Sequence, residues 1–483
     1  MKHFYKLYLT LTIILGLSSF SSFSQTVQQI PCYTDEYRNA AIQANPTLAE
    51  KIRSREEVIY LKNHPSVPEG EPQGLIVAPT PENPVIIPVV VHVLYNSNTP
   101  EVNIDDSQIE SQIQALNDNM DANNMNIKFC FAQTAPAGHT WPGRAGITRT
   151  ITGLKFKATT SGFQALANVI YFPPNKYLNI YIVKSICPND TIDCTGNTAQ
   201  IFGVAPSFPY DLNSPVDGVI MNYRVFGDNS KGGKYPLYPS NNEGKVLVHE
   251  IGHYLNLYHT FEADCIGSGG DCTKEGDKIC DTNPCDIVEG CPNSHSSCGF
   301  NTDLDNYMQY TDDACRSKFT SGQRQRIYDS FDLYKDRNDL ISSTNLSAVG
   351  VECIPQGLIA EFEATPNQVC KKDSVIYTFI TPPNSVVNQW EWYFPGSTTP
   401  GPITGIGPHR IKYNTSGNYD VTLTVGDNAG HFSTNTKKGF VFVSDCNPIA
   451  DKDGQWFFGS DAGFDFSEGY AKPIYSNLSN ITG

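Results

Sequence analysis

The sequence predicts an α/β domain built on a mixed, twisted sheet, followed by an Ig-like β-sandwich. Between residues 83 and 345, segments with the features of strands alternate with segments of helical spacing, an order typical of a sheet backed by helices. Between residues 355 and 446, short runs rich in Val, Thr and Tyr alternate at the strand period, with turn residues between them. Seven of the 14 cysteines lie between residues 265 and 315, which predicts a disulfide-rich subdomain at the end of the first domain.

The composition limits the classes of function. The chain has 483 residues, of which 39% are hydrophobic, so it can bury more than one core. Its formal net charge of -16 argues against a nucleic-acid partner, because phosphate binding needs clustered Lys and Arg. We therefore expect a folded, multidomain protein with no nucleic-acid partner.

Residues 1–24 have the pattern of a secretory signal peptide. Lys2 and Lys6 precede an apolar stretch from Leu7 to Leu17, and small residues around Ser24 provide a cleavage site. A membrane anchor is the alternative, but the apolar run is shorter than the roughly 18 residues that span a bilayer, and no later segment reaches that length. We expect a secreted, extracellular protein with no membrane span, and association with the cell surface stays open.

Residues 25–82 are predicted to form a pro-segment and linker. The stretch DEYRNAAIQANPTLAEKI is polar and partly helical in pattern, and it leads into the Pro-rich stretch PSVPEGEPQGLIVAPTPENP. A buried strand follows, because β-branched residues are dense from Val85 to Tyr95. Within that strand, His92 is predicted to be a core histidine rather than a ligand. A helix is predicted over 107–120, and further strands over 126–132, 177–183 and 218–223.

The segment HEIGHYLNLYH concentrates side chains that can bind a metal ion. In a helix over 245–257, His249 and His253 stand four residues apart and project from one face, where two imidazoles can hold a zinc ion. Glu250 follows the first histidine, and a carboxylate there can reach a zinc-bound water without joining the metal.

His259 is the third candidate ligand. It lies six residues beyond His253, so the chain must leave the helix and turn back. Asn256 is the residue at this point that best tolerates left-handed backbone angles. Three imidazoles would leave a fourth zinc position open for water, which is the arrangement of a catalytic site.

These motifs resemble a known family. HExxHxxGxxH is the zinc signature of the metzincin peptidases, and the chain is similar to it with Asn256 in place of Gly. The segment NYMQYTDDAC supplies Met308 as the counterpart of the methionine turn. With HEIGHYLNLYHTF and FTSGQRQRI, these segments look most like the pappalysin family, which includes ulilysin-like secreted bacterial peptidases. The likeness covers about residues 83–340 and implies a metzincin-like domain with an active-site helix.

The resemblance also implies a mechanism. In that family, zinc-assisted hydrolysis cleaves peptide bonds, so the expected activity is that of a zinc endopeptidase acting on proteins or peptides. Glu250 would be the general base for a zinc-bound water, and Tyr310 would add a hydrogen bond to the oxyanion of the reaction intermediate. Met308 would pack beneath the zinc ligands.

A calcium site is a further expectation. GDKICDTNPCD places hard oxygen ligands within one loop, which resembles the calcium loop of pappalysins: Asp277, Asp281, Thr282 and Asp286. A solvated acidic loop held by disulfides is the alternative.

Cys32 lies upstream of the linker with no obvious partner. A thiolate is a good zinc ligand, so Cys32 could fill the open zinc position until the pro-segment is removed, which resembles the cysteine switch of metzincin zymogens. The pro-segment would then act as an intramolecular inhibitor of a latent zymogen. A disulfide involving Cys32 is the alternative. Among the remaining 13 cysteines, Cys130 is the expected buried free thiol.

The sandwich resembles a polycystic kidney disease (PKD) domain. WEWYFPGSTTP and HRIKYNTSGNYDVTLTVGDNAG carry the likeness, and it implies that Trp392 and Tyr419 are core aromatics. Such a module would serve as a spacer or attach the protein to substrate. Residues 447–483 are too short to fold alone and look like the opening of another β module, so the encoded protein could be longer.

Two other functions stay open at this point. The first is a surface adhesin or binding protein in which the peptidase-like domain is a non-catalytic scaffold. Glu250 argues against it, because a scaffold has no use for a general base. The second is a different HExxH peptidase whose third ligand is a downstream glutamate, and His259 argues against that reading.

Overall fold

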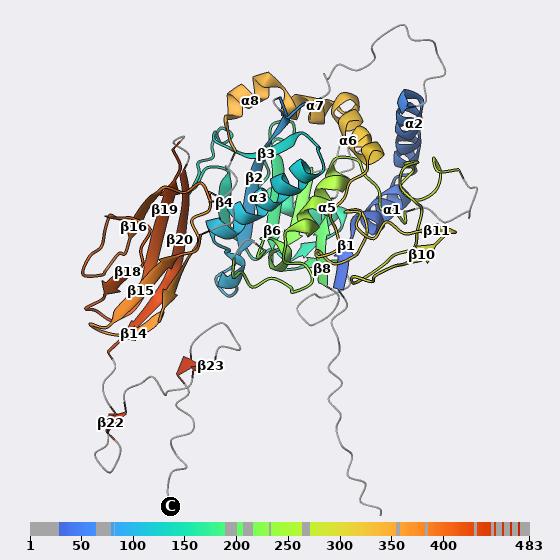
Figure 1. Cartoon of the computed structure of the whole chain (residues 1–483). Coiled ribbons are helices and arrows are strands. Elements are labelled where there is room, and N and C mark those ends of the chain that lie inside the picture. The colour runs from blue at the N-terminus through green and yellow to red at the C-terminus, as the bar shows by residue number, and fades with distance from the viewer. Residues whose placement is uncertain are drawn as a thin grey trace, which may run out of the picture.

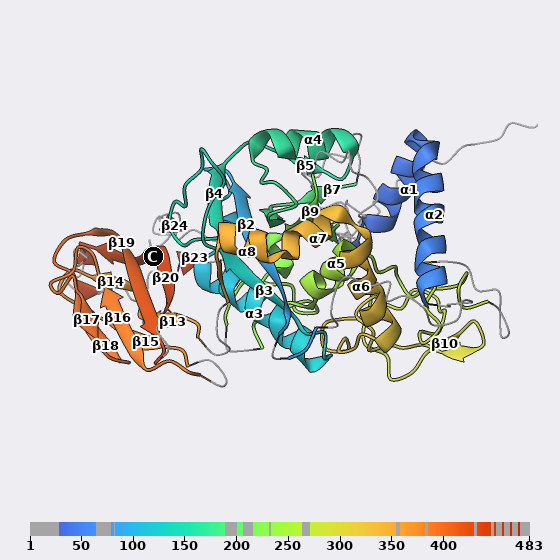
Figure 2. The same cartoon turned by 90° about the horizontal axis from the view of Figure 1, so that it is seen from above.

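We describe the protein from a computed structural model of the chain. The described residues are 29–63, 79–81, 83–188, 200–205, 216–230, 233–262, 271–353, 358–381, 385–428 and 432–445, with four residue pairs nearer the C-terminus. The predicted signal peptide over residues 1–24 and most of the predicted linker lie outside them. Figures 1 and 2 show two bodies, a mixed α/β body and a β-sandwich.

Within the described residues, an eight-stranded mixed sheet forms the base of the first body, and its long central strand is β2 (Val85–Tyr95). Parallel to β2 run β3 (Ile127–Ala132), β4 (Ile147–Ile151) and β6 (Leu178–Val183). The sheet continues from β6 to the parallel β9 (Gly218–Asn222) and then to the antiparallel β8 (Gln200–Val204). β12 (Val351–Glu352) is antiparallel to β3. The predicted mixed sheet is confirmed.

Helices cover both faces of this sheet (Figure 2). On one face, α3 (Asp106–Ala122) and α5 (Lys245–Tyr254) contribute to the main core, in which alternate sheet residues such as Ile180 and Met221 are buried. On the other face, α4 (Thr160–Val169) packs through Phe163 against Tyr181 and Ile220. The alternation of neighbouring strand residues between the two cores is what a sheet buried on both sides requires.

A strand of the predicted pro-segment extends the sheet beyond β8. β1 (Gln29–Cys32) runs parallel to β8, with Cys32 opposite Gly203 (Figure 1). Two helices follow it, α1 (Thr34–Ala44) and α2 (Pro46–Asn63). The sequence predicts the helical character but not the strand, because four residues interrupted by Pro31 carry no periodicity of their own. The open edge of β8 supplies the hydrogen-bond partners that make this segment a strand.

Three helices complete the first body after the cysteine-rich stretch. They are α6 (Ser321–Leu333), α7 (Lys335–Ile341) and α8 (Ser343–Val349). The short elements are η1 (Pro100–Val102), η2 (Tyr223–Val225), β5 (Phe156–Lys157), β7 (Ile186–Cys187), β10 (Ser296–Ser297) and β11 (Phe300–Asn301). α6 begins with a capping box in which Thr320 and Gln323 satisfy each other's backbone N–H groups, and this fixes where the helix starts.

The cysteine pairing differs from the sequence-based expectation at two positions. Cys130 is not a free thiol, because it forms a disulfide with Cys353. The antiparallel pairing of β3 with β12 brings these two residues together across 223 positions of sequence, and no local pattern reports such a contact. Within the cysteine-rich stretch, Cys272–Cys280 and Cys291–Cys315 are local disulfides as expected. Among the described cysteines, Cys285 is free and buried, as is Cys32.

The second body is a sandwich of two sheets. One sheet has the order β13-β15-β18 and the other β14-β20-β19-β16-β17. Their bounds are β13 (Phe362–Thr365), β14 (Gln368–Cys370), β15 (Ser374–Phe379), β16 (Gln389–Tyr393), β17 (Ile403–Thr404), β18 (His409–Lys412), β19 (Gly417–Gly426) and β20 (Phe432–Ser444). Trp392 is fully buried between the sheets, and Tyr419 stacks on Tyr413 at 4.5 Å between ring centroids. The predicted β-sandwich is confirmed.

The sandwich is fastened to α3 by buried polar contacts. The Ser433 hydroxyl on β20 donates a hydrogen bond to Glu110 on α3, and the Ser107 hydroxyl donates to Glu361 over 2.7 Å. Arg144 lies 2.7 Å from the other oxygen of Glu110, so this buried carboxylate has a cationic partner. The sandwich is therefore attached to the first body by specific contacts as well as by the chain connection.

The remaining described residues form two short strand pairs. They are β21 (Ile449–Ala450) with β22 (Trp456–Phe457), and β23 (Phe464–Asp465) with β24 (Lys472–Pro473). Across the described parts of the chain, no helix combines the length and the apolar character needed to cross a bilayer.

His92 is a core histidine, as predicted. It is fully buried on β2, with Nδ1 at 2.8 Å from the Thr148 hydroxyl and Nε2 at 3.0 Å from the Asn179 side-chain oxygen. Burial lowers the pKa of His92 from 6.5 to about 4.

Replacing His92 by Gln should make the fold less sensitive to acid. As the pH falls from 6.5 toward about 4, the unfolded chain binds a proton at His92 that the folded chain does not bind. The free energy of unfolding therefore falls by up to roughly 1.4 kcal/mol per pH unit in this window, and H92Q should lack that component. Urea unfolding at several pH values checks this, and equal pH slopes for the two proteins would contradict it.

Candidate metal centre

The helix α5 carries the first two predicted ligands in a buried position. Gly244 precedes the helix with φ 73°, and a side chain here would press against Gln112 and Ala115 of α3. His249 and His253 lie one helical turn apart and are both buried. α5 therefore presents two buried imidazoles from one face.

The chain reverses immediately after α5, at the residue that the sequence indicates. Asn256 has φ 79°, the left-handed conformation, and the backbone N–H of Leu257 returns to the carbonyl of Gly252 over 2.8 Å. The guanidinium of Arg326 donates from Nε to the Asn256 carbonyl over 2.7 Å and so braces the turn. This reversal carries His259 back toward the other two histidines.

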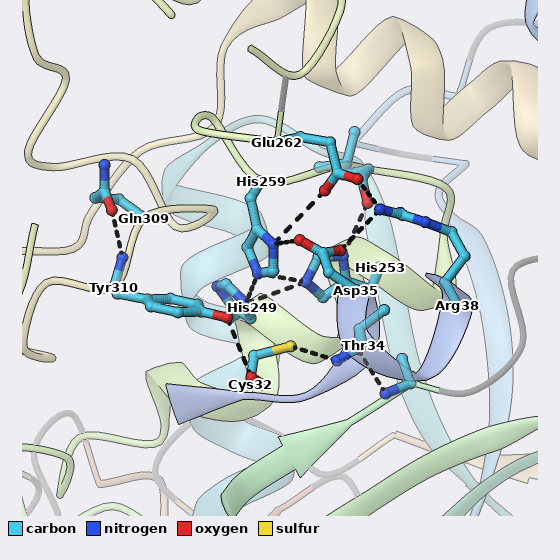
Figure 3. Close-up of polar contacts among 12 residues, drawn as sticks. Cys32, Thr34, Asp35, Arg38, His249, His253, His259, Glu262, Gln309 and Tyr310 are labelled. Atoms are coloured by element: carbon cyan, nitrogen blue, oxygen red, sulfur yellow. Dashed lines mark hydrogen bonds and ion pairs between the residues drawn. The ribbon is translucent and has the colours of Figure 1, made fainter. Parts of the chain in front are cut away.

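The three Nε2 atoms converge on one point (Figure 3). They lie 3.1 Å apart for His249–His253, 3.0 Å for His253–His259 and 3.1 Å for His249–His259. Each Nδ1 faces an acceptor instead: the Tyr307 carbonyl at 2.7 Å, the Leu257 carbonyl at 2.9 Å and the Asp35 carboxylate at 2.5 Å, in the same order.

This pattern sets the tautomers. An acceptor beside Nδ1 places the proton on that nitrogen and leaves a lone pair on Nε2. Burial lowers the pKa of His249 well below its ordinary value and that of His253 to about 3, so these two rings are neutral at neutral pH, as metal binding requires. Three lone pairs directed at one another repel unless a cation lies between them. The donor set therefore fits a divalent metal ion.

Cys32 adds a fourth donor to the same group. Its Sγ and the three Nε2 atoms all lie within 4.8 Å of one another. Cys32 is free and fully buried, so the alternative of a disulfide is wrong. Burial, and then the nearby Glu250, raise the pKa of the Cys32 thiol well above its ordinary value. One thiol and three imidazoles are donors of the kind that would hold a zinc ion.

Glu250 lies beside these donors without belonging to the group that converges. Its carboxylate is fully buried and accepts a hydrogen bond from the Thr34 hydroxyl over 3.4 Å and a weak one from the Cys32 thiol over 3.7 Å. Burial raises the pKa of Glu250 to about 8, although these two hydrogen bonds partly offset the rise. A side chain on Gly203 of β8 would collide with this carboxylate, so glycine keeps the space open.

Met308 packs against α5, and Tyr310 lies beside the histidine rings. Met308 is fully buried, and its sulfur fills the space left by the absent side chain of Gly252 on α5. The ring of Tyr310 lies 4.9 Å from that of His259, and its hydroxyl donates to the Cys32 carbonyl over 3.1 Å (Figure 3). Tyr310 thus points into the site and is hydrogen-bonded to β1.

The sequence does not predict the charged partners of His259. Asp35 of α1 binds His259 Nδ1, and Arg38 lies 3.2 Å from Asp35 and forms a short ion pair with Glu262 (Figure 3). Burial alone would raise the pKa of Asp35, but His259 and Arg38 lower it below its ordinary value. The only sequence signal is an acidic residue in the first turn of a helix, a pattern with a purely local explanation.

The residues proposed for calcium have other partners. Asp281 accepts hydrogen bonds at the start of α6 from the Thr320 and Ser321 hydroxyls, at 2.7 and 2.8 Å. Asp277 is buried and accepts from Thr282 and from the Gln323 amide. Among the described residues, neither aspartate belongs to a group of acidic, His or Cys side chains that could hold a metal ion. Calcium binding in this loop stays a prediction.

Comparisons with known proteins agree with this site. Residues 166–332 match the Peptidase_M43 family model, described as "Pregnancy-associated plasma protein-A". The chain is 28% identical over 254 residues to an "Extracellular metalloprotease" of Arthroderma otae, which covers 52% of this chain and 79% of that protein.

Solved structures give further matches. Mature mirolysin of Tannerella forsythia, in complex with a cleaved peptide, is 30% identical, with 55% of this chain and 98% of that one covered and a TM-score of 0.43. A mutant of promirolysin is 28% identical, with 64% and 96% covered and a TM-score of 0.47. The PKD1 domain of the Vibrio cholerae metalloprotease PrtV is 25% identical, with 17% and 94% covered and a TM-score of 0.14.

The fold and the converging histidines define a metallopeptidase. The family model spans α5 and the methionine that packs against it. The chain belongs to the Peptidase_M43, or pappalysin, family of metallopeptidases, and a PKD-like sandwich follows the peptidase body.

Substitutions at Asn256 should separate the backbone requirement from the side chain. Asn256→Gly should keep the stability and metal content of the parent protein, because glycine adopts the left-handed conformation freely. Asn256→Ala should cost about 1 kcal/mol and lower the metal content, because alanine resists that conformation. Both substitutions remove the amide, so their difference isolates the backbone. Urea unfolding and metal analysis measure it, and equal effects of Gly and Ala would contradict the interpretation.

Proposed function

We propose that the protein is a secreted zinc endopeptidase made as a latent precursor. The observation that carries this proposal is the convergence of His249, His253 and His259 through Nε2, with Glu250 beside them and Cys32 as a fourth donor. Residues 25–82 would be the pro-segment and linker, 83–345 the catalytic domain and 355–446 the PKD-like module.

Zinc held by the three imidazoles would act as a Lewis acid that makes water a better nucleophile and polarises the scissile carbonyl. His249, His253 and His259 would hold it as neutral ligands. The carbonyls of Tyr307 and Leu257 orient the first two rings through their Nδ1–H groups.

Glu250 would carry the proton through the reaction. Its carboxylate takes a proton from the attacking water while the water oxygen bonds to the scissile carbonyl carbon. The carboxylic acid then returns this proton to the leaving amine as the C–N bond breaks. The Tyr310 hydroxyl would donate a hydrogen bond to the oxyanion, and its present contact with the Cys32 carbonyl supports this role.

Latency would come from the part of the pro-segment that runs from β1 to the start of α1. β1 covers the edge of β8, where backbone groups would otherwise be free to pair with an extended substrate. Cys32 fills the fourth donor position, and Thr34 holds the carboxylate of Glu250. Removal of this segment would open the position for water and the edge strand for substrate.

The setting of the activity is also proposed. The fungal relatives are named extracellular metalloproteases, and residues 1–24 have the pattern of a signal peptide, so we place the enzyme outside the cell. Calcium bound near Asp277 would stabilise the cysteine-rich subdomain. The alternative of a non-catalytic adhesin would need Glu250 to be dispensable.

Replacing Glu250 by Gln should abolish most hydrolysis without loss of zinc. In the processed enzyme we expect kcat/KM to fall by roughly 10²–10⁴-fold, because a carboxamide cannot accept the proton from water. Zinc content should stay unchanged, since Glu250 is outside the converging donor set. Glu289→Gln, at an exposed position, is the matched control. Full hydrolysis by E250Q, or hydrolysis that persists in a zinc chelator, would exclude the proposed function.

Replacing Cys32 by Ala should relieve latency. The uncleaved C32A precursor should hydrolyse a short peptide at least about tenfold faster than the uncleaved parent, because loss of one metal ligand is worth more than ~1.4 kcal/mol. Initial rates, with electrophoresis to confirm that the precursor is intact, provide the measurement.

Cys285→Ala is the control for this comparison. Cys285 is also free and buried, but its thiol donates a hydrogen bond to the Thr260 hydroxyl. It is outside the converging donor set. Its replacement should leave latency intact. If C285A activates the precursor as much as C32A does, the role of the thiol in latency is wrong.

A further inference from the structure

A glutamate of the pro-segment occupies a specific site on the peptidase body. Glu56, on α2, accepts two hydrogen bonds from the guanidinium of Arg326 on α6, at 3.0 and 2.6 Å. The hydroxyl of Tyr258 donates to the same carboxylate over 2.9 Å. Figures 1 and 2 show α2 lying next to α6 at this point. A guanidinium that binds both oxygens of a carboxylate is a geometrically selective contact.

The site is fixed in place by the turn that builds the metal centre. Arg326 uses Nε to bind the carbonyl of Asn256, which leaves the other two nitrogens of the guanidinium for Glu56. Tyr258 precedes His259 directly in the chain and is 2% exposed. Both donors therefore belong to the rigid peptidase body and not to the pro-segment.

Two cationic side chains of the peptidase body lie at this site. Lys278 lies 4.7 Å and Arg326 4.6 Å from the centre of the Tyr258 ring, and both stay with the peptidase. Glu56 would leave, and so would Arg38, whose guanidinium lies 5.1 Å from the same ring. The departure of Glu56 would remove the carboxylate that accepts two hydrogen bonds from Arg326, while Arg326 and Lys278 stay with the peptidase.

Apolar surface surrounds the cationic site. Tyr258 and Tyr334 of the peptidase body pack with Leu48 and Ile52 of α2 in one cluster. Ile59 of α2, three residues after Glu56, is buried and lines a cavity of about 640 Å³ next to the site. Lys278, Asp281 and Arg326 line the same cavity. The complementary ligand is thus a helix with a carboxylate and apolar residues one turn away on the same side.

We propose that Arg326, Tyr258 and Lys278 form a carboxylate-binding exosite in the processed enzyme, which takes an acidic amphipathic peptide outside the catalytic position. The occupant seen in the precursor, Glu56 in a helix with apolar neighbours, defines the chemistry of that peptide. The inference rests on the proposed function, because the exosite opens only when the pro-segment leaves.

The test is peptide binding to the processed protein, prepared from the full chain by removal of its pro-segment. The probe is a fluorescent peptide of residues 34–63, which lacks Cys32 and so brings no thiol to the metal. Anisotropy titration should show binding. The Glu56→Gln peptide should bind about tenfold or more weakly, because a bidentate charge-assisted contact is lost. The Glu57→Gln peptide changes the charge equally at an exposed neighbour and should bind within about twofold of the parent peptide.

Substitutions on the protein give the reciprocal test. Tyr258→Phe removes only the hydroxyl. It should weaken the binding of the parent peptide and leave the binding of the Glu56→Gln peptide little changed. Arg326→Lys keeps the positive charge but removes the planar guanidinium that binds both carboxylate oxygens. Arg324→Lys on the same helix is its matched control. Metal analysis of each variant shows whether the Asn256 turn is intact.

The outcomes separate this inference from the proposed function. Hydrolysis of an unrelated unstructured peptide is measured on the same preparation. Hydrolysis without peptide binding would exclude the exosite but not the proposed activity. An equal loss of affinity for the Glu56→Gln and Glu57→Gln peptides would do the same. Selective binding without hydrolysis supports the exosite and removes the proposed activity.

Discussion

The structure depends on the mutual approach of three imidazole lone pairs. Nitrogen atoms at 3.0 to 3.1 Å that all point at one another are unfavourable unless a positive charge lies between them. A helix can bring only two of these rings to one face, so the third requires the left-handed turn at Asn256. The packing of Met308 below, and of Arg326 behind the turn, follows from the need to hold that reversal in place.

The N-terminal segment over residues 29–63 contacts this centre at several positions. Cys32 meets the donor atoms themselves, while Thr34 and Asp35 meet Glu250 and His259. Farther out, Glu56 meets the arginine that braces the turn. These contacts follow one another outward from the group of donor atoms. They give the docked segment a defined geometry in addition to its apolar packing, since charged and hydrogen-bonding groups are directional.

Much of this was open to prediction because the signals are local. The strand over Val85–Tyr95 follows from its density of β-branched residues, and the helix of the metal motif follows from the spacing of its apolar residues. The spacing of His249 and His253, and the tolerance of asparagine for positive φ, are also properties of a few consecutive residues. The interpretation of His92 as a core residue rested on the apolar strand around it, and its two hydrogen bonds satisfy it there.

The kind of ligand, its spacing and the need for a turn could thus be predicted, because each depends on residues within one or two helical turns. The pairing of Cys130 with Cys353 and the contact of Asp35 with His259 could not be predicted in this way. Those contacts join residues some two hundred positions apart. They depend on which strand edges meet and in which register, and these are properties of the packed chain that no local pattern encodes.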